Sequence, residues 1–308
     1  MIDALDDIVS RARIVGRLDF QAALSEECGV AFCDEHGRTR YHILIDGNCW
    51  AMIDGAPAPV NLNAVSLLIV PRGKRHTIAG SVDAPIDEPG DFGVHRPTAP
   101  GSGTGGALNN APGSKPVAAV VSGVFEMDRD IGNVLVDELP AYLHMSLSDN
   151  EDLNWLADAV RFVARDVAEG APGAAAVADR LGKIIFMETI KAFAETAASG
   201  VIASLRDPKV GAALSAFHRA PAESWTVSSL AKAAGVSRTL FAERANALLG
   251  MTPMQYVRDW RLMLARRMLA ESARSIEEVA REVGYSSASA FTKAYRSYYG
   301  VDPRRKPT

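Results

Sequence analysis

The spacing of apolar residues divides this 308-residue chain into stretches of different character. Residues 1–20 repeat apolar positions every three or four residues, which predicts an amphipathic helix. From about Gly29 to Pro71, short apolar or alternating runs are separated by turn residues such as Asp46-Gly47-Asn48 and Asp54-Gly55. Evenly spaced short strands of this kind predict a β-sandwich or β-barrel.

A long insertion and two helices follow the strand-rich region. Residues 83–116 are rich in Pro, Gly, Ser, Ala and Asn, so they predict a flexible loop, and strand character returns over 117–125. Two amphipathic helices are expected within about 149–198, with a break at 170–173, packed on their own barrel or on a partner subunit. Their apolar stripes are Leu153, Leu156, Val160, Val163 and Val167 in the first helix, and Val177, Leu181, Ile184, Ile185 and Ile190 in the second.

The last hundred residues contain an internal repeat with a period of about 50 residues. Each copy has the pattern of a helix, a glycine turn, a second helix and a Gly-x-x-Pro end. The recurring residues are Ala231, Gly235, Phe241, Gly250 and Pro253 in the first copy, and Ala280, Gly284, Phe291, Gly300 and Pro303 in the second.

Each copy has the local chemistry of a helix-turn-helix unit, at about 226–249 and about 275–299. Ser or Thr stands where a helix cap is needed, and Gly235 and Gly284 stand at the turns, where a left-handed backbone favours glycine. A helix over about 253–269 joins the units and spans roughly 25 Å. Held by this helix, the two recognition helices can enter successive major grooves, which lie about 34 Å apart on one face of DNA. The recognition helices are expected to bury Phe241, Ala245 and Leu248 in the first unit, and Phe291, Tyr295 and Tyr298 in the second.

The faces of these helices that remain outward are expected to meet double-stranded DNA. Their side chains can reach base edges or phosphates when a helix lies in the major groove. The alternative is an all-helical interaction domain without nucleic acid, which two units in register disfavour. The predicted DNA-binding residues are Ser237, Arg238, Thr239, Glu243, Arg244, Asn246 and Arg261 in and after the first unit, and Ser287, Ser289, Thr292, Lys293 and Arg296 in the second.

Charge is distributed unevenly along the chain. Residues 207–308 carry 16 Lys and Arg against 9 Asp and Glu, whereas residues 1–206 carry 17 against 28, so the net charge of −4 hides a basic C-terminal part. A basic part joined to an acidic part favours contact of the basic part with a polyanion.

Composition excludes several other classes of protein. Apolar residues make up 48% of the chain and charged residues 23%, as in globular rather than disordered proteins. There is no apolar run long enough for a transmembrane helix, and the acidic start at 1–7 lacks the features of a secretory signal, so we expect a cytoplasmic protein with no membrane partner. Cys28, Cys33 and Cys49 are an odd number and argue against a disulfide framework, and acidic neighbours disfavour a redox-sensing thiol at the first two.

Six motifs run through the last hundred residues: Trp225-Thr226-Val227-x-x-Leu230-Ala231, Val236-Ser237-Arg238-Thr239-x-Phe241, Gly250-Met251-Thr252-Pro253-Met254-x-Tyr256, Trp260-Arg261-x-x-x-Ala265, Val279-Ala280-x-x-Val283-Gly284-Tyr285-x-Ser287-x-x-x-Phe291 and Gly300-x-x-Pro303. Through these motifs, residues 207–305 resemble the DNA-binding domain of the AraC/XylS family of bacterial regulators. The resemblance implies a sequence-specific DNA-binding transcription regulator, of the activator type that contacts RNA polymerase, and bound to the nucleoid when it acts.

The first unit departs from the family pattern at two positions. The family usually has Arg and, two residues on, Phe where this chain has Glu243 and Ala245. Loss of a buried Phe side chain costs about 3–5 kcal/mol unless neighbours fill the gap, and Glu243 places a negative charge where phosphate is expected. We therefore expect the second unit to contribute more reliably to DNA affinity, and a regulator with decayed DNA binding is an alternative.

Residues 1–200 resemble the cupin-type sensor domain attached to many AraC-like regulators. The segment Pro71-x-Gly73-x-x-His76 is similar to the second cupin motif, and His42 stands where cupins place a metal-binding histidine. Full metal-binding cupins carry His-x-His and a Glu, and two histidines are too few for a catalytic metal, so no metal, cofactor or catalytic residue is assigned. His42, Trp50 and His76 are expected to line a small-molecule effector pocket, or the two histidines to form hydrogen bonds inside the barrel mouth.

The expected fold is thus a two-domain α+β protein. A cupin-like β-barrel with flanking helices, over 1–200, would sense a signal and form a homodimer, and an all-α double helix-turn-helix domain, over 207–305, would bind promoter DNA. An effector would act by binding one arrangement of the protein better than another. The rival from another class is a cupin-type metalloenzyme with a helical accessory domain, and the incomplete metal set counts against it.

Overall fold

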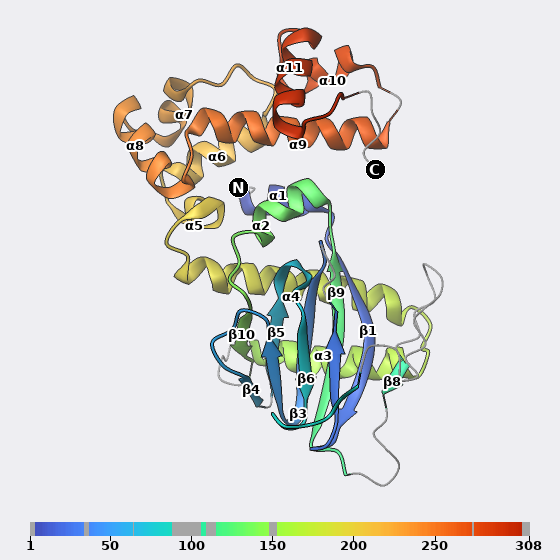
Figure 1. The fold of residues 1–308 in the computed structure, drawn as a ribbon. Coiled ribbons are helices and arrows are strands. Elements are labelled where there is room, and N and C mark those ends of the chain that lie inside the picture. The colour runs from blue at the N-terminus through green and yellow to red at the C-terminus, as the bar shows by residue number, and fades with distance from the viewer. Residues whose placement is uncertain are drawn as a thin grey trace. The chain divides into compact units, whose positions relative to one another are not determined.

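The computed structural model describes residues 4–33, 37–63, 65–87, 106–108, 115–147, 153–272 and 274–303. Two compact units are found, one rich in strands and one helical (Figure 1). The helical unit draws on two segments from the first half of the chain, whereas a sequential division near 200–207 was expected. The strand-rich unit is Ile14–Met127 with Leu139–Phe193, and the helical unit is Met1–Arg13, Asp128–Glu138 and Ala194–Thr308.

The strand-rich unit is built around one long strand, β3 (Thr39–Ile53). The other elements of its sheet are β1 (Val15–Leu24), β2 (Gly29–Phe32), β4 (Val60–Asn63), β5 (Ser66–Val70), a 3-10 turn (Pro71–Gly73), β6 (His76–Ala79), β7 (Ile86–Asp87), β8 (Gly106–Leu108), β9 (Ala118–Glu126) and β10 (Leu143–Ser146). The first half of β3 pairs with β5 and β9, and its second half pairs with β4 and β6, so this strand belongs to both layers of a sandwich. Among the described residues, the order β7-β2-β6-β3-β9-β1-β8 does not close into the predicted barrel.

The predicted loop over 83–116 lies mostly outside the described residues. Its two described strands are short: β7 pairs with β2, and β8 pairs with β1. The expected helix start near Ser148 or Asp149 also lies outside the described residues. None of the helices in the described ranges is long and apolar enough to cross a lipid bilayer.

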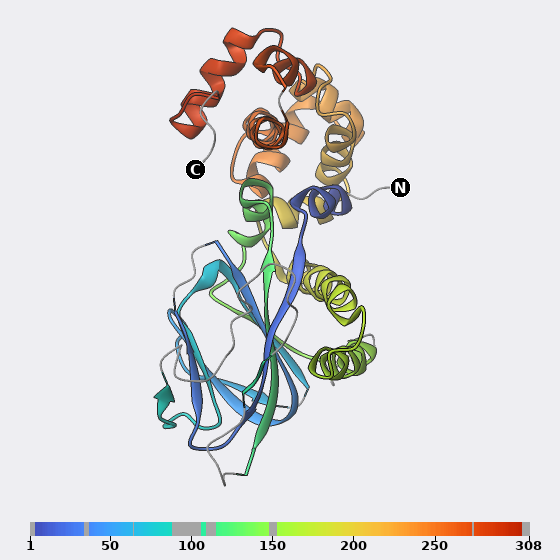
Figure 2. The same cartoon turned by 90° about the vertical axis from the view of Figure 1, so that its right-hand side faces the viewer.

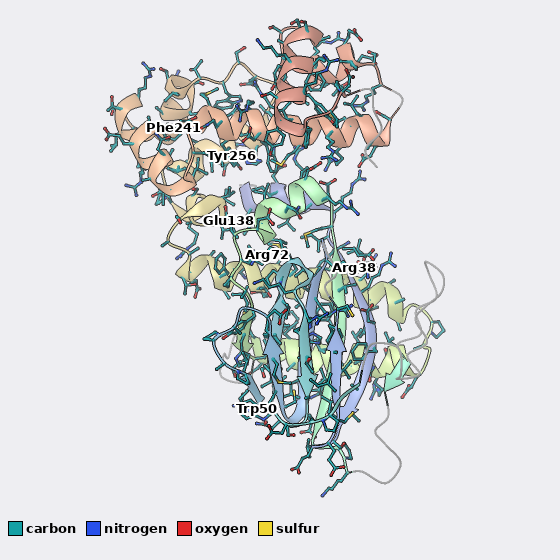
Figure 3. The ribbon with its side chains drawn as sticks, in the orientation of Figure 1. Arg38, Trp50, Arg72, Glu138, Phe241 and Tyr256 are labelled. Carbon is teal, nitrogen blue, oxygen red and sulfur yellow. The ribbon has the colours of Figure 1, made fainter. Side chains whose placement is uncertain are left out.

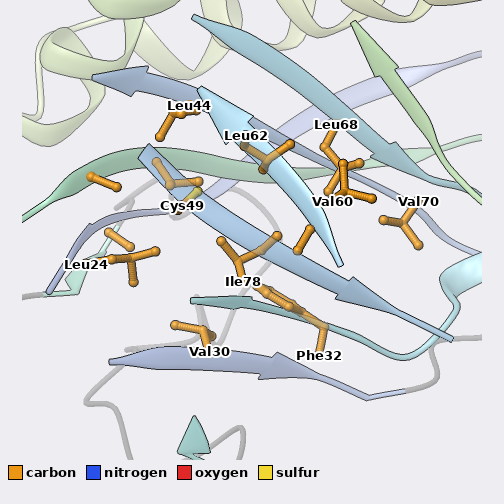
Figure 4. Packing of buried hydrophobic residues seen from close by; sticks show 14 of the residues in the cluster. Leu24, Val30, Phe32, Leu44, Cys49, Val60, Leu62, Leu68, Val70 and Ile78 are labelled. Carbon is orange, nitrogen blue, oxygen red and sulfur yellow. The ribbon is translucent and has the colours of Figure 1, made fainter. Parts of the chain in front are cut away.

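The apolar core of this unit lies between the two layers of strands (Figure 4). Successive side chains of a strand point to opposite faces, so one set from each strand meets in the middle. Phe20, Phe32, Leu44, Leu62 and Ile78 come from five different strands and belong to one buried cluster. The interior of the sandwich is therefore filled by side chains at this level.

Two helices cover one face of the sheet, α3 (Asn154–Ala168) and α4 (Ala174–Thr196) (Figures 1 and 2). The whole apolar stripe predicted for α3 is buried. In α4, the predicted Leu181, Ile185 and Ile190 are buried, but Val177 and Ile184 are 49% and 39% exposed, so the predicted inward placement of these two was wrong. Ala178 and Gly182 complete the buried face, which is centred away from the two exposed side chains.

The strand β1 and the helix α4 approach each other at a pair of glycines. A Cβ atom added to Gly182 would lie 2.5 Å from the Cα of Gly16. The N–H of Gly16 donates to the carboxylate of Asp179 over 3.2 Å. Only about 10 Å³ of free space is left between sheet and helices here, room for about one water molecule.

The helical unit is organised along α9 (Pro253–Glu271), with α7 and α8 toward one end and α10 and α11 toward the other (Figure 1). Its first unit contains α7 (Val227–Ala234) and α8 (Arg238–Leu249), and its second contains α10 (Ile276–Glu282) and α11 (Ala288–Tyr299). The remaining helices are α1 (Ala4–Ala12), α2 (Arg129–Val136), α5 (Gly200–Arg206) and α6 (Val210–Arg219). Both α8 and α11 pack against α9, so this helix is shared by the two units.

The glycine contact between β1 and α4 predicts the effect of adding one methyl group. Gly182→Ala should destabilise the strand-rich unit by about 1–3 kcal/mol, because overpacking forces the helix away from the strand. The midpoint of thermal unfolding measures this loss. Ala176→Leu, exposed on another face of the same helix, should leave the midpoint unchanged. A midpoint raised by Gly182→Ala, as helix propensity alone would give, contradicts the contact.

Candidate functional site

The helices of both helix-turn-helix units begin at side-chain caps. The hydroxyls of Thr226, Ser237, Ser275 and Ser287 each accept a hydrogen bond from the backbone N–H three residues further on. Such caps satisfy amide groups that a helix start leaves unpaired, and each contributes about 1 kcal/mol. The serines predicted to touch DNA at 237 and 287 therefore also define where the recognition helices start.

The buried stripes of the two recognition helices differ from the prediction at one position each. We expected spacing i, i+4, i+7, but the stripes follow i, i+4, i+8. The side chains turned inward are Phe241, Ala245 and Leu249 in α8, and Phe291, Tyr295 and the half-buried Tyr299 in α11. Tyr298 is 42% exposed, and Leu248 is only partly buried, because the face turned inward is centred further round each helix than position i+7.

The outward face of α11 lines an open groove of about 520 Å³. Ser289, Thr292, Lys293 and Arg296 all border it, so the structure brings these four predicted residues together. Lys293 and Arg296 are exposed. The guanidinium of Arg296 also donates to the carboxylate of Asp302.

The outward face of α8 is less basic. Arg238, Thr239, Glu243 and Asn246 are exposed, as predicted. Arg244 is exposed as well, but its Nε–H donates to Asp207 over 2.7 Å. The carboxylate of Glu243 is thus exposed on this face, and Arg244, one of the two arginines of α8, is paired with Asp207.

Asp207 anchors α8 to the start of α6. Besides Arg244, its carboxylate accepts hydrogen bonds from the backbone N–H groups of Lys209 and Val210. Asp302 has a comparable position at the end of α11, where it binds Arg296. Sequence analysis missed both acids, because an ion pair between a loop and a helix leaves no periodic signal in the chain.

Arg261 on α9 makes its contacts within the protein. Its Nε–H donates to the carbonyl of Pro221, and its Nη2 donates to the carbonyl of Glu223. A Cβ atom added to Gly284, which has φ 86°, would lie 2.7 Å from that Nη2 atom. The glycine at the second turn is thus required both by its backbone conformation and by the passage of this side chain.

Two predicted sensor residues meet inside the strand-rich unit. The Nε2 atoms of His42 on β3 and His76 on β6 lie 2.8 Å apart, and both side chains are buried. The Nδ1 of His42 lies 2.8 Å from Oγ of Ser122, and the Nδ1 of His76 lies 2.7 Å from the carbonyl of Lys74. The ring of Phe32 stacks on His76 at 4.7 Å.

The partners of the histidine rings assign their protons. The carbonyl of Lys74 only accepts, so His76 donates from Nδ1 and its neutral ring accepts at Nε2. His42 then donates from Nε2 and accepts at Nδ1 from the hydroxyl of Ser122. Both rings are satisfied in the neutral form, and burial, with His76 and Arg40 nearby, holds the pKa of His42 well below its usual value.

This arrangement does not fit a metal centre. All four ring nitrogens of His42 and His76 have protein partners. No group of three or more His, Cys, Asp or Glu side chains in the described ranges is placed to hold a metal ion.

Trp50 does not join the two histidines. The pairing of β3 with β9 shifts register between Leu44 and Asp46, and after this irregularity the inward positions are Cys49 and Ala51. The side chain of Trp50 is therefore on the face opposite the core. It lies at the end of the sheet opposite Arg38 (Figure 3).

Comparison with known proteins gives two family matches. A family described as "Cupin" matches residues 3–195, and a family described as "Helix-turn-helix domain" matches residues 230–306. Together they span the sandwich with its helices and both helix-turn-helix units.

Three similar proteins illustrate the comparison. An AraC-like transcription regulator of Streptomyces lividans is 27% identical over 314 residues, covering 100% of this chain and 99% of the relative. The HTH-type transcriptional regulator AlkR of Acinetobacter baylyi is 32% identical over 182 residues, covering 58% of this chain and 59% of AlkR. The solved DNA-binding domain of AdpA, in complex with a target DNA, is 32% identical and covers 32% of this chain and 86% of its own, with a TM-score of 0.30.

The neutral His42 predicts a pH dependence of stability. Because its pKa is lowered by folding, the unfolded chain binds a proton first as pH falls below about 6.5. Stability should then fall with pH by up to about 1.4 kcal/mol per unit from this group. His42→Gln should lower the unfolding midpoint at pH 8 but flatten its decline between pH 6.5 and 5. Equal declines in the two proteins would contradict the assignment.

Proposed function

This chain belongs to the AraC-like transcription regulators that carry an N-terminal cupin domain, and we propose that its second helix-turn-helix unit supplies most of its affinity for promoter DNA. The protein is a DNA-binding transcription regulator. The observation that carries the proposal is the groove beside α11, where Lys293 and Arg296 stand exposed on one face of a capped recognition helix.

The chemistry of that face supports DNA contact. A recognition helix presents the residues near its start to base edges and uses basic side chains for phosphates. Ser289, Thr292 and Lys293 lie in the first half of α11, and Arg296 lies one turn further on. Asp302 binds the guanidinium of Arg296 in the absence of DNA. The guanidinium is therefore already oriented when a phosphate or a base takes the place of Asp302 as its partner.

The first unit has a different role in this proposal. Arg238, Thr239 and Asn246 are exposed and can read bases, but Glu243 on the same helix repels phosphate. We assign to this unit a contribution to specificity rather than to general affinity. Arg261 then acts by fixing the segment before α7 beside the turn of the second unit, rather than by contacting DNA.

We place signal recognition in the strand-rich unit, since the cupin match covers it. A small-molecule effector bound there would favour one conformation of the protein over another, and His42, Trp50 and His76 stay the predicted effector residues. The protein would then act in the bacterial cytoplasm as a non-enzymatic activator that contacts RNA polymerase.

We propose that the outer faces of α3 and α4 form a homodimer. Trp155 and Phe162 on α3 are 49% and 54% exposed, and Val177 and Ile184 are exposed on the neighbouring α4. The same face of α3 carries an acid and a base that are paired with each other, Asp158 and Arg161. A surface with apolar side chains and both signs of charge is self-complementary, as a two-fold interface requires.

Selection of genomic DNA fragments by the full-length protein, followed by sequencing, tests the proposed function. The retained fragments should share a motif. With such a fragment, Lys293→Ala/Arg296→Ala should weaken binding by about 10- to 100-fold and lower the dependence of affinity on salt, since cationic contacts are lost. Arg75→Ala, exposed just before β6 in the strand-rich unit, is the control. Unchanged affinity in the double variant would reject the second unit as the main contact.

The dimer has a separate test. Phe162→Glu places a charge in the apolar patch, so the full-length protein should sediment as a monomer at concentrations at which the wild type is a dimer. Glu27→Lys, exposed in the turn between β1 and β2, should leave the sedimentation coefficient unchanged. A wild type that sediments as a monomer, or a variant that still dimerises, would rule out this interface.

A further inference from the structure

The helices α1 and α2 come from the first half of the chain but pack within the helical unit. The helix α1 contacts α2, α5 and α6, and α2 contacts α5 and α9. Ile8 of α1 and Ile131 and Leu135 of α2 are fully buried in these contacts. These two helices are therefore part of the body that carries both recognition helices.

Polar contacts also attach α1 and α2 to the helical unit. The carboxylate of Glu138, after α2, accepts from the backbone N–H groups of Val201 and Ile202 at the start of α5. The carbonyl of Arg11 at the end of α1 accepts from Arg267 of α9 over 2.7 Å. These bonds fix both helices against segments that lie far away in the sequence.

One side chain of α9 contacts both α2 and the second recognition helix. The guanidinium of Arg266 donates to Asp130 of α2 over 3.2 Å. The same guanidinium lies over the ring of Tyr299, the last residue of α11, at 4.5 Å from the ring centre. A cation over an aromatic face is attracted to it, so Arg266 binds α2 and α11 at once.

The position of Tyr299 depends on its ring rather than on its hydroxyl. The buried Oη of Tyr299 has no hydrogen-bond partner among the described residues. Its ring contacts Tyr295 at 4.7 Å between centres, in addition to Arg266. Since Tyr295 belongs to the buried stripe of α11, the ring of Tyr299 links that stripe to α9.

We infer that Asp130, Arg266 and Tyr299 form a contact chain that positions the second recognition helix, with Arg266 as the central positioning residue. This inference rests on the proposed function of α11 as the main DNA-binding helix. Arg266 acts through Tyr299 and need not touch DNA. The strand β9 ends at Glu126 and α2 starts at Arg129, so the helix that binds Arg266 follows a sandwich strand almost directly.

Hydrogen exchange in the DNA-free, full-length protein tests the chain without reference to DNA. Asp130→Asn and Arg266→Gln should each speed exchange in the last turn of α11, and leave α8 and the strand-rich unit unchanged. Arg17→Gln breaks an exposed ion pair with Glu126, between β1 and β9 of the strand-rich unit, and serves as the control. Unchanged exchange in α11 in both variants would overturn the inference.

Reversing both charges separates positioning from general stability. In Asp130→Lys/Arg266→Glu the ion pair between α2 and α9 is restored, so amide hydrogen exchange in α2 should return toward the wild-type rate. The carboxylate at 266 is repelled by the face of the Tyr299 ring, so amide hydrogen exchange in α11 should stay faster than in the wild type. Recovery of α2 and α11 together would show that Arg266 only holds α2, and would reject its role toward α11.

DNA spacing gives the functional readout. A retained fragment has one segment for each helix-turn-helix unit. Inserting one base pair between these segments moves the major groove of one relative to that of the other by about 3.4 Å and rotates it by about 35°. Arg266→Gln should bind the original fragment about three- to tenfold more weakly and discriminate less between the two spacings. Equal discrimination in wild type and variant would contradict positioning. Failure of the wild type to retain any fragment would instead reject the proposed function, and the exchange result would still decide the inference.

Discussion

The length and rigidity of α9 constrain everything that the helical unit does. Its 19 residues extend over about 28 Å at the usual rise of an α-helix. Thr252 and Gln255 cap its start reciprocally, with Pro253 in its first turn. Both helix-turn-helix units pack on it, and its buried residues include Trp260. The distance between the two recognition helices is therefore a property of one helix, and any residue that orients either unit does so against α9.

The same helix brings together parts of the chain that the family matches separate. Residues 4–13 and 128–138 fall within the cupin match, yet their helices complete the core of the helical unit. Asp7 of α1 lies 3.3 Å from His218 of α6. His218 is hydrogen-bonded to Tyr256 of α9, and its ring lies against that of Trp260 on the same helix. The buried surface of the helical unit is therefore built in part from segments that lie within the cupin match.

The strand-rich unit depends on neutral, fully bonded polar groups in its interior. His42, His76 and Ser122 satisfy one another, and Arg40 pairs with Asp19 and lies over the ring of Phe32. Buried polar groups are costly unless each is bonded, so such a set favours one arrangement of the strands that carry it. A ligand that enters this region has to offer bonds that replace those it breaks.

The sequence alone determined what depends on neighbours along the chain. Caps such as Thr226 and Ser237 and the glycine turns were correctly predicted, because these hydrogen bonds and dihedral angles involve residues within one turn of each other. Tertiary structure decided what depends on distant segments. A register shift in β3 turns Trp50 away from His42, and the guanidinium of Arg261 donates hydrogen bonds to backbone carbonyls. Tertiary structure also placed α1 and α2 in the helical unit, since complementary buried surface and not sequence order selects the neighbours of an amphipathic helix.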